Sequence, residues 1–130
     1  MTRKRVGYFE GTDSTLLTTL VCDGYDTIPV SNGRDKHGRH VRLINAKNRV
    51  DLLIAYVHKI VAPDAEARER DDVIFSDLFR ICRILEIPLL LEAPTDLHPR
   101  AMALLENPPD IVTFVDPADT LEVARRLLAG

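Results

Sequence analysis

Val50-Asp51-Leu52-Leu53-Ile54-Ala55-Tyr56-Val57 is the most apolar stretch of the chain, and it decides the fold. Its apolar residues follow one another almost without interruption. A half-exposed strand alternates apolar and polar side chains, whereas a strand that is covered on both faces is apolar throughout. The stretch therefore predicts the central strand of a parallel sheet with helices on both sides.

Four further β-prone runs flank this stretch along the chain: Arg5–Phe9, Thr27–Val30, Ile87–Leu91 and Asp110–Val115. Segments with apolar residues at helical spacing separate the runs. Alternation of strand and helix is typical of a parallel sheet, and right-handed crossovers place every strand-to-helix loop at one edge. We expect one α/β domain over residues 1–130, a three-layer sandwich that is Rossmann-like or flavodoxin-like. Its sheet is expected to be five-stranded and mostly parallel, with helices on both faces.

Several boundaries of these elements can be read from single residues. Asp13 or Ser14 is expected to cap the first helix, and Gly24 to end it. Pro29 lacks an amide donor, which favours an edge position for the second strand. A further helix is expected to hold Val41, Leu43 and Ile44.

The second half of the chain carries similar signals. A helix is expected from Ile74 to Leu85, because one broad face of this segment is apolar. Thr95 or Asp96 is expected to cap the next helix, and Asp116-Pro117 to open the last one.

Composition excludes several classes of function. The 130 residues suit one globular domain, with 45% hydrophobic and 28% charged residues. A net charge of −3 gives no general attraction to nucleic acid or to an anionic membrane. No apolar run approaches the roughly 18 residues of a membrane span, and no secretory core follows the first methionine. We therefore expect a cytoplasmic protein that binds neither nucleic acid nor membrane.

The two cysteines, Cys22 and Cys82, lie far apart in apolar helical segments and form no C-x-x-C motif. We expect both to be buried, reduced thiols. No metal-ligand spacing is present, so neither a metal nor a cofactor is expected.

Ligands of parallel α/β folds bind at the carboxyl ends of the strands, which makes the strand-to-helix loops the place to search. The first loop, Gly11-Thr12-Asp13-Ser14-Thr15, joins a glycine to three hydroxyl side chains at a helix start. Unpaired amides and the helix dipole favour an anion there, so Gly11, Thr12, Ser14 and Thr15 are candidate phosphate ligands. An ordinary helix cap is the alternative, and the Asp13 carboxylate opposes an anion.

The second loop, Ser31 to Arg39, adds Gly33 for turn geometry and the cations Arg34, Lys36 and Arg39. Arginine and lysine pair strongly with phosphate oxygens, so these residues could complete the anion site. A solvated polar loop is the alternative reading.

Catalytic candidates also lie on these loops. Asp35 could act as a general base, with His37 or His58 as proton donor. His58 stands where the central strand ends, at the start of a long charged connection to Asp72. That connection could form a lid over a ligand site, or a loop that extends into solvent.

The order of these motifs resembles the methylglyoxal synthase-like domain family. Gly11-Thr12-Asp13-Ser14 followed by Leu16-Leu17 is similar to the family's phosphate loop and helix, and Val50–Ile54 to its Ile-Asp-Leu-Val-Ile strand. The segments Arg39–Asn45 and Arg80–Pro88 are similar to two of its helices, the second ending in Asn-Ile-Pro. The resemblance implies that Thr12 and Ser14 bind phosphate. At the position of the family's catalytic histidine this chain has Asp71, which favours a regulatory or non-catalytic domain.

Gly11-Thr12-Asp13-Ser14-Thr15 is also similar to the pyrophosphate-gripping loop of PP-loop ATP pyrophosphatases. The sequence thus leaves three functions open. The first is a domain that binds a small phosphorylated or anionic ligand, and the second is an enzyme, either a carbon-oxygen lyase acting on a triose phosphate or an ATP-using transferase. The third is an interaction module. Self-association into a homo-oligomer also stays open.

Overall fold

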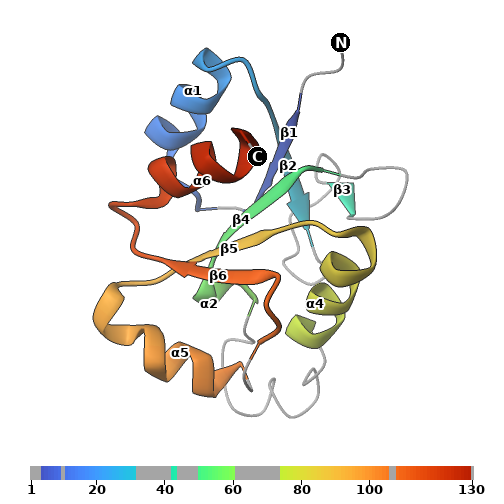
Figure 1. The fold of residues 1–130 in the computed structure, drawn as a ribbon, viewed down its shortest axis with the longest axis vertical. Helices are drawn as coiled ribbons and strands as arrows, with labels where there is room; N and C mark the ends of the chain where they lie inside the picture. The colour runs from blue at the N-terminus through green and yellow to red at the C-terminus, as the bar shows by residue number, and fades with distance from the viewer. Residues whose placement is uncertain are drawn as a thin grey trace.

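The fold is a parallel sheet covered by helices on both faces (Figure 1). A computed structural model describes residues 4–9, 11–31, 42–43, 50–60, 74–105 and 108–129. The strands are β1 (Arg5–Tyr8), β2 (Asp26–Ser31), β3 (Arg42–Leu43), β4 (Leu52–Tyr56), β5 (Leu89–Glu92) and β6 (Val112–Val115). The helices are α1 (Ser14–Cys22), α2 (Val57–Ile60), α4 (Ile74–Leu85), α5 (His98–Leu104) and α6 (Thr120–Ala129), with a 3-10 turn η1 (Thr95–Leu97) before α5.

The strand order is β3-β2-β1-β4-β5-β6, and every neighbouring pair is parallel. This order and the helical layers confirm the α/β sandwich predicted from the sequence. The five predicted strands are present, and the two-residue β3 extends the sheet beyond β2.

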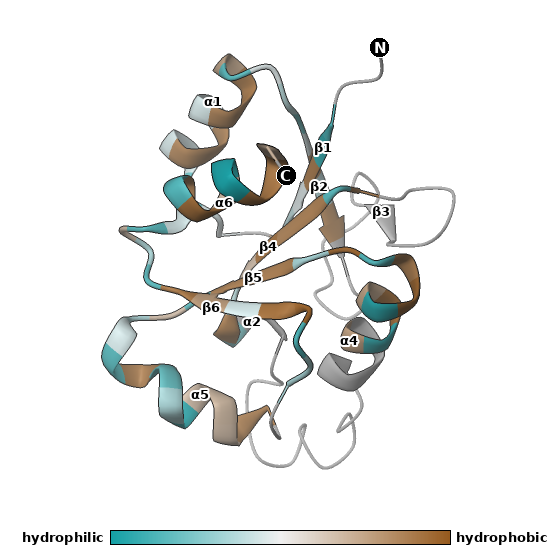
Figure 2. Ribbon diagram, viewed as in Figure 1, coloured by the Kyte–Doolittle hydropathy of each residue, from teal (hydrophilic) through white to brown (hydrophobic). Residues whose placement is uncertain are grey.

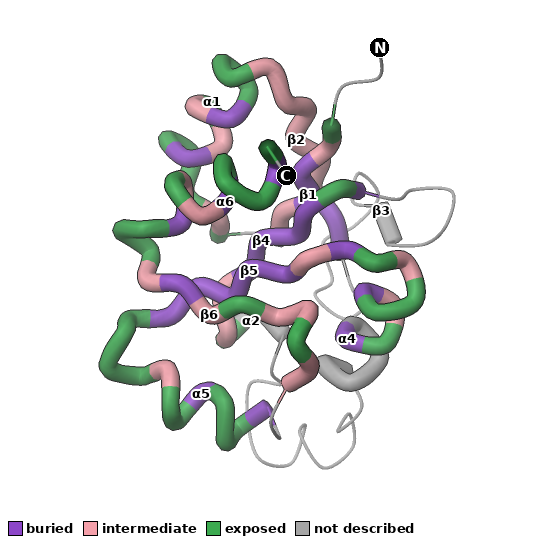
Figure 3. The backbone as a smooth tube through the Cα atoms, viewed as in Figure 1, coloured by how far each residue is buried: buried purple, intermediate pink, exposed green. Residues whose placement is uncertain are grey.

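Strand β4 lies in the middle of the sheet and is buried on both faces (Figure 3). Leu52 and Ile54 pack in the core under α1 and α6, whereas Leu53 and Ala55 pack in the core under α4. Alternate residues of a strand point to opposite faces, so a strand serving two cores is apolar throughout. Each buried leucine or isoleucine stabilises the fold by about 1.5–3 kcal/mol.

The same division continues through the other strands and helices. Helices α1 and α6 lie side by side on one face, and α4 covers the other (Figure 1). Figure 2 shows the apolar residues gathered on β4 and β5, between these layers. On α4, Phe79 and Cys82 are buried and Arg80 and Arg83 are exposed, as the apolar face of that segment predicts.

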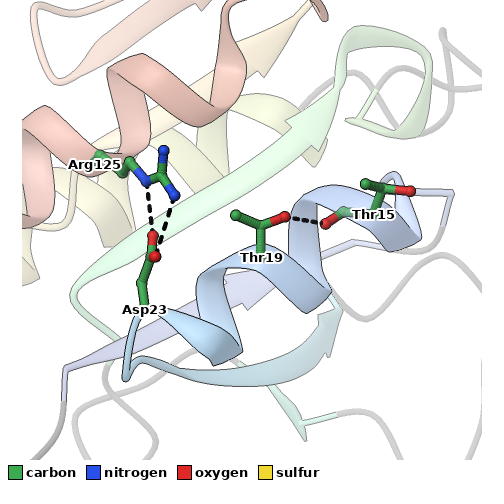
Figure 4. Close-up of polar contacts among 4 residues, drawn as sticks. All are labelled: Thr15, Thr19, Asp23 and Arg125. Carbon is green, nitrogen blue, oxygen red and sulfur yellow. Dashed lines mark hydrogen bonds and ion pairs between the residues drawn. The ribbon is translucent and has the colours of Figure 1, made fainter.

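Helix α1 is tied to α6 by an ion pair (Figure 4). Arg125 donates from Nε and from a terminal nitrogen to the Asp23 carboxylate, at 2.7 and 3.1 Å. This two-point contact joins the carboxyl end of α1 to the middle of α6. Within α1, the Thr19 hydroxyl donates to the Thr15 carbonyl oxygen at 2.8 Å.

The predicted ends of α1 are confirmed. The Asp13 carboxylate accepts the Leu16 amide at 2.9 Å, which is the bond of an N-cap. Gly24 has a φ of 100° just after the helix, a conformation that glycine adopts without strain.

The helix expected around Val41–Ile44 is wrong at Arg42–Leu43, which form β3. β3 pairs with Val30 and Ser31, so it satisfies backbone groups at the open side of β2. The edge position expected for the second strand is wrong, because β2 lies between β3 and β1. Pro29 itself is paired with Tyr8 of β1, and the described pairs with β3 begin at Val30, one residue after it.

Two predicted helix starts are also wrong. Thr95 and Asp96 lie inside η1, whose N-cap is Pro94 without a side-chain bond. Thr95 instead donates to Asp116 from its amide and its hydroxyl. The Ala118 amide donates to the Asp116 carboxylate and the Asp119 amide to the Asp116 carbonyl oxygen, so a turn follows Asp116 and α6 begins at Thr120.

The expectation for the cysteines is half correct. Both thiols are free, but Cys22 is exposed on α1 and only Cys82 is buried. Cys22 lies on the outer side of a helix whose buried residues are Leu16 and Leu20. None of the helices in the described ranges has the length and apolarity to cross a membrane.

A substitution at Gly7 tests the packing of the central strands. An added Cβ would lie 2.8 Å from a methyl of Leu53 and 3.2 Å from methyls of Val30 and Val50. Because all three contacts are in the core, we expect Gly7→Ala to lower the free energy of unfolding by about 1–3 kcal/mol. Chemical denaturation measures the change. The control Thr113→Ala, on an exposed position of β6, is expected to stay within about 0.5 kcal/mol of the original chain. Equal stability of Gly7→Ala and the control would contradict the packing.

Candidate functional site

The strand order reverses between β1 and β4. The chain moves outward from β1 to β2 and β3, then returns to the other side of β1 and continues through β4, β5 and β6. Loops that follow β1 and β4 therefore leave the sheet in opposite directions, which opens a crevice at the carboxyl edge. This edge is where a ligand site is expected.

A pocket of about 410 Å³ lies at this edge, on the side of the sheet that carries α1 and α6. We call it the edge pocket. Its volume falls within the roughly 300–1,000 Å³ typical of small-molecule sites. It is lined by Asp13, Thr15, Leu16, Thr19, Tyr56, Glu92, Pro117, Ala118 and Leu121.

The first wall of the edge pocket is the start of α1. Gly11 has a φ of 92°, which a glycine permits in the tight turn after β1. The Thr12 hydroxyl donates to the Phe9 carbonyl oxygen at 2.7 Å and closes the turn. The Asp13 carboxylate caps the amide of Leu16, and within the described residues the amides of Ser14 and Thr15 have no acceptor.

The second wall is the turn between β6 and α6, and Asp116 holds it in place. One oxygen of this carboxylate accepts the amide and hydroxyl of Thr95 at 3.1 and 3.0 Å, and the other accepts the Ala118 amide at 3.0 Å. The amide bonds to Ala118 and Thr95 lower the pKa of Asp116, so it stays ionised. The wall formed by Pro117 and Ala118 is thereby braced against the neighbouring loop.

Glu92 is a buried carboxyl group at the end of β5. Its side chain is only 2% exposed, and Oε2 accepts the Thr120 hydroxyl at 2.8 Å. Oε1 is buried without a hydrogen-bond partner in the part of the chain that the structure describes. Burial raises the pKa of Glu92, the Thr120 bond opposes this rise, and the Asp13 charge adds to it. A buried polar atom without a partner is costly and calls for an explanation.

Tyr56 ends β4 and is paired in register with Glu92 on β5. Both side chains point to the α1 and α6 face, because they continue the alternation that begins at Leu52 and Leu90. Burial, with the charges of Glu92 and Asp13, raises the pKa of the Tyr56 phenol. The hydroxyl is therefore protonated and able to donate.

The structure brings together part of the first predicted loop. Thr15 lines the edge pocket, while Gly11, Thr12 and Ser14 lie in the turn and the first position of α1 beside it. His58 is exposed at the start of α2, and its ring centroid lies 5.6 Å from that of Tyr56. The other predicted site residues, Gly33, Arg34, Asp35, Lys36, His37 and Arg39, lie outside the described residues.

Sequence reasoning missed Tyr56, Glu92 and the α6 side of the pocket. Glu92 had a signal: it is an acid that directly follows the apolar run of β5, at the carboxyl end of a buried strand. Glu92 comes two residues after Leu90 on the same strand, so the alternation of side chains places it on the α1 face. Pro117, Ala118 and Leu121 had no local signal, since their approach to α1 depends on the packing of two helices that are distant in sequence.

Metal binding and catalysis by a cysteine nucleophile have little support among the described residues. No cluster of three metal-ligating side chains occurs among those residues. Burial raises the pKa of the Cys82 thiol to about 12, so it is not a nucleophile. A second hollow of about 560 Å³, which includes Arg5, Tyr25 and Asp26, lies near the amino ends of β1 and β2, away from the ligand edge.

No protein-family model matches this sequence, and a comparison with curated proteins gave no significant match. The resemblance to the methylglyoxal synthase-like domain therefore stays a hypothesis.

Replacing Glu92 tests its buried environment through the pH dependence of stability. A raised pKa means that the folded chain holds this proton more tightly than the unfolded chain does. The resulting stabilisation is fully present below the ordinary pKa of 4.5 and is lost as pH rises through the raised value. Glu92→Gln removes the titration. We therefore expect its melting temperature, relative to the original chain, to increase between about pH 4 and pH 8.

Glu122→Gln is the matched control, because Glu122 is exposed in the first turn of α6 and undergoes the same chemical change. Its melting temperature is expected to follow that of the original chain. A constant difference between Glu92→Gln and the original chain at every pH would exclude a raised pKa.

Proposed function

We propose that this chain binds a small phosphorylated metabolite at the edge pocket, as a regulatory or non-catalytic domain of the methylglyoxal synthase-like type. The observation that carries the proposal is the convergence of two helix amino ends on one pocket. Thr15 and Leu16 of α1 and Leu121 of α6 all line it. The amino end of a helix carries unpaired amides and a partial positive charge, which favour a phosphate group.

The amides of Ser14 and Thr15 are the donors that a phosphate oxygen would meet first. Each charge-assisted hydrogen bond contributes about 1.5–3 kcal/mol. The Asp13 carboxylate opposes the anion, but it is exposed and bonded to Leu16. In water-like surroundings, two unit charges about 4 Å apart repel by about 1 kcal/mol. Two amide bonds therefore outweigh the repulsion from Asp13.

The basic segment after β2 supports the same proposal. In the sequence, Arg34, Lys36 and Arg39 follow β2, whose carboxyl end lies beside that of β1. Arginine and lysine pair strongly with phosphate oxygens, so in this proposal these cations would offset the two carboxylates of the pocket.

Ser14→Pro removes one proposed donor without disturbing the helix. Ser14 is the first residue of α1, a position where proline is well tolerated, and Asp13 before it is extended, with φ of −58° and ψ of 127°. We expect the affinity for inorganic phosphate and dihydroxyacetone phosphate to fall roughly tenfold or more. Isothermal titration calorimetry measures the change.

The control is Ser14→Ala, which removes the hydroxyl but keeps the amide. We expect it to bind more tightly than Ser14→Pro. Calorimetry of the original chain with inorganic phosphate, dihydroxyacetone phosphate and nucleotides gives the decisive reference. No heat with any of these compounds would remove the proposed function.

A further inference from the structure

Resting on the proposed function, we propose that the edge pocket is selective for sugar phosphates. In this arrangement the phosphate lies at the start of α1, and the hydroxyl groups of the sugar bind to Glu92 and Tyr56. Glu92 and Tyr56, which we call the floor of the pocket, thus recognise a second part of the ligand, separate from the phosphate.

Glu92 has an acceptor beside the pocket that no described residue satisfies. Its Oε1 accepts no hydrogen bond in the described part of the chain, although the side chain is 2% exposed and belongs to the pocket lining. A buried acceptor without a donor costs about 1–3 kcal/mol. Oε1 is itself buried, so in the proposed complex the Glu92 carboxyl group turns about its last torsion, which is broad in glutamate, to meet a donor in the pocket. A ligand hydroxyl supplies the missing hydrogen bond.

The polar side chains of the pocket include both hydrogen-bond donors and acceptors. Tyr56 belongs to the pocket lining, and its hydroxyl can both donate and accept a hydrogen bond. It stands beside Glu92 in register, and Asp13 adds carboxylate acceptors on the α1 side. A hydroxyl group uses both kinds of partner, whereas an ammonium group can only donate. A sugar ring with neighbouring hydroxyl groups therefore matches these donors and acceptors better than a cationic ligand does.

Part of the pocket lining is apolar. Leu16 and Leu121 face the pocket from the two helices, and Pro117 joins them from the turn before α6. A sugar ring has polar edges and apolar C–H faces. Pocket walls of this kind bury such a face while a small number of polar groups set the orientation.

The two parts of the proposed ligand site are contiguous. Asp13 and Thr15 line the pocket, and the unpaired amides of Ser14 and Thr15 belong to the same turn of chain. One molecule can therefore place its phosphate on these amides and its hydroxyls over Glu92. A triose phosphate such as dihydroxyacetone phosphate offers only one hydroxyl, so it leaves part of this floor unused.

The test compares ribose 5-phosphate with n-pentyl phosphate, which has the same number of carbons and the phosphate but no hydroxyls. Calorimetry with the original chain is expected to give roughly 10- to 100-fold tighter binding of ribose 5-phosphate, because hydroxyls on a buried carboxylate form strong hydrogen bonds. Glu92→Gln and Tyr56→Phe are each expected to remove most of that difference. Glu122→Gln, exposed on α6, is expected to preserve it.

The outcomes separate this inference from the proposed function. Equal affinity for the two compounds, or an unchanged preference in both Glu92→Gln and Tyr56→Phe, would overturn the sugar selectivity and leave the phosphate site standing. Binding of free ribose that is lost in Tyr56→Phe, together with no heat from inorganic phosphate or n-pentyl phosphate, would support the hydroxyl subsite and reject the phosphate site. Thermal melting verifies that each variant is folded, and Tyr56→Phe carries the test if Glu92→Gln does not fold.

Discussion

The burial of β4 on both faces is the constraint on which the rest of the structure depends. Leu52 and Ile54 serve one core, Leu53 and Ala55 the other, so β4 cannot move without exposing one of them. Reciprocal bonds fix its register against β1: the Arg5 amide donates to the Asp51 carboxylate and the Asp51 amide to the Arg5 carbonyl, each at 2.8 Å. With both central strands fixed and parallel, their carboxyl ends must lie side by side.

That alignment also explains how polar groups come to lie at the floor of a pocket. Tyr56 and Glu92 are the last residues of β4 and β5, and each continues an apolar strand by one step of the same alternation. They inherit the inward direction of Ile54 and Leu90 at the point where the core gives way to the loops. A carboxyl group in this place lies between apolar neighbours and an open pocket, which is the condition under which burial raises a pKa.

The sequence predicts features that depend on local pattern and fails where a distant contact decides. The burial of β4 on both faces, the Asp13 cap and the buried face of α4 follow from periodicity and residue type alone. Thr95 was expected to be a cap because of its residue type, but Asp116 binds it from the next loop. Cys22 stands in an apolar stretch of sequence, yet it is exposed. The side of α1 that faces solvent is set by how the helix packs, which the local sequence does not show. The edge pocket also depends on distant contacts: of its nine lining residues, three lie more than 90 positions after Asp13 and two are the last residues of strands.

The electrostatics of the edge pocket bear on what it can hold. The amino ends of α1 and α6 favour negative charge, whereas Asp13 and Glu92 favour hydrogen-bond donors and positive charge. A simple anion would satisfy the helix ends and leave Glu92 Oε1 without a partner, and a simple cation would satisfy Glu92 and meet the positive ends of two helices. A neutral, donor-bearing group joined to a phosphate satisfies both regions at once. Glu92 is buried and the start of α1 is exposed, so in the proposed complex the hydroxyls would point inward and the phosphate outward.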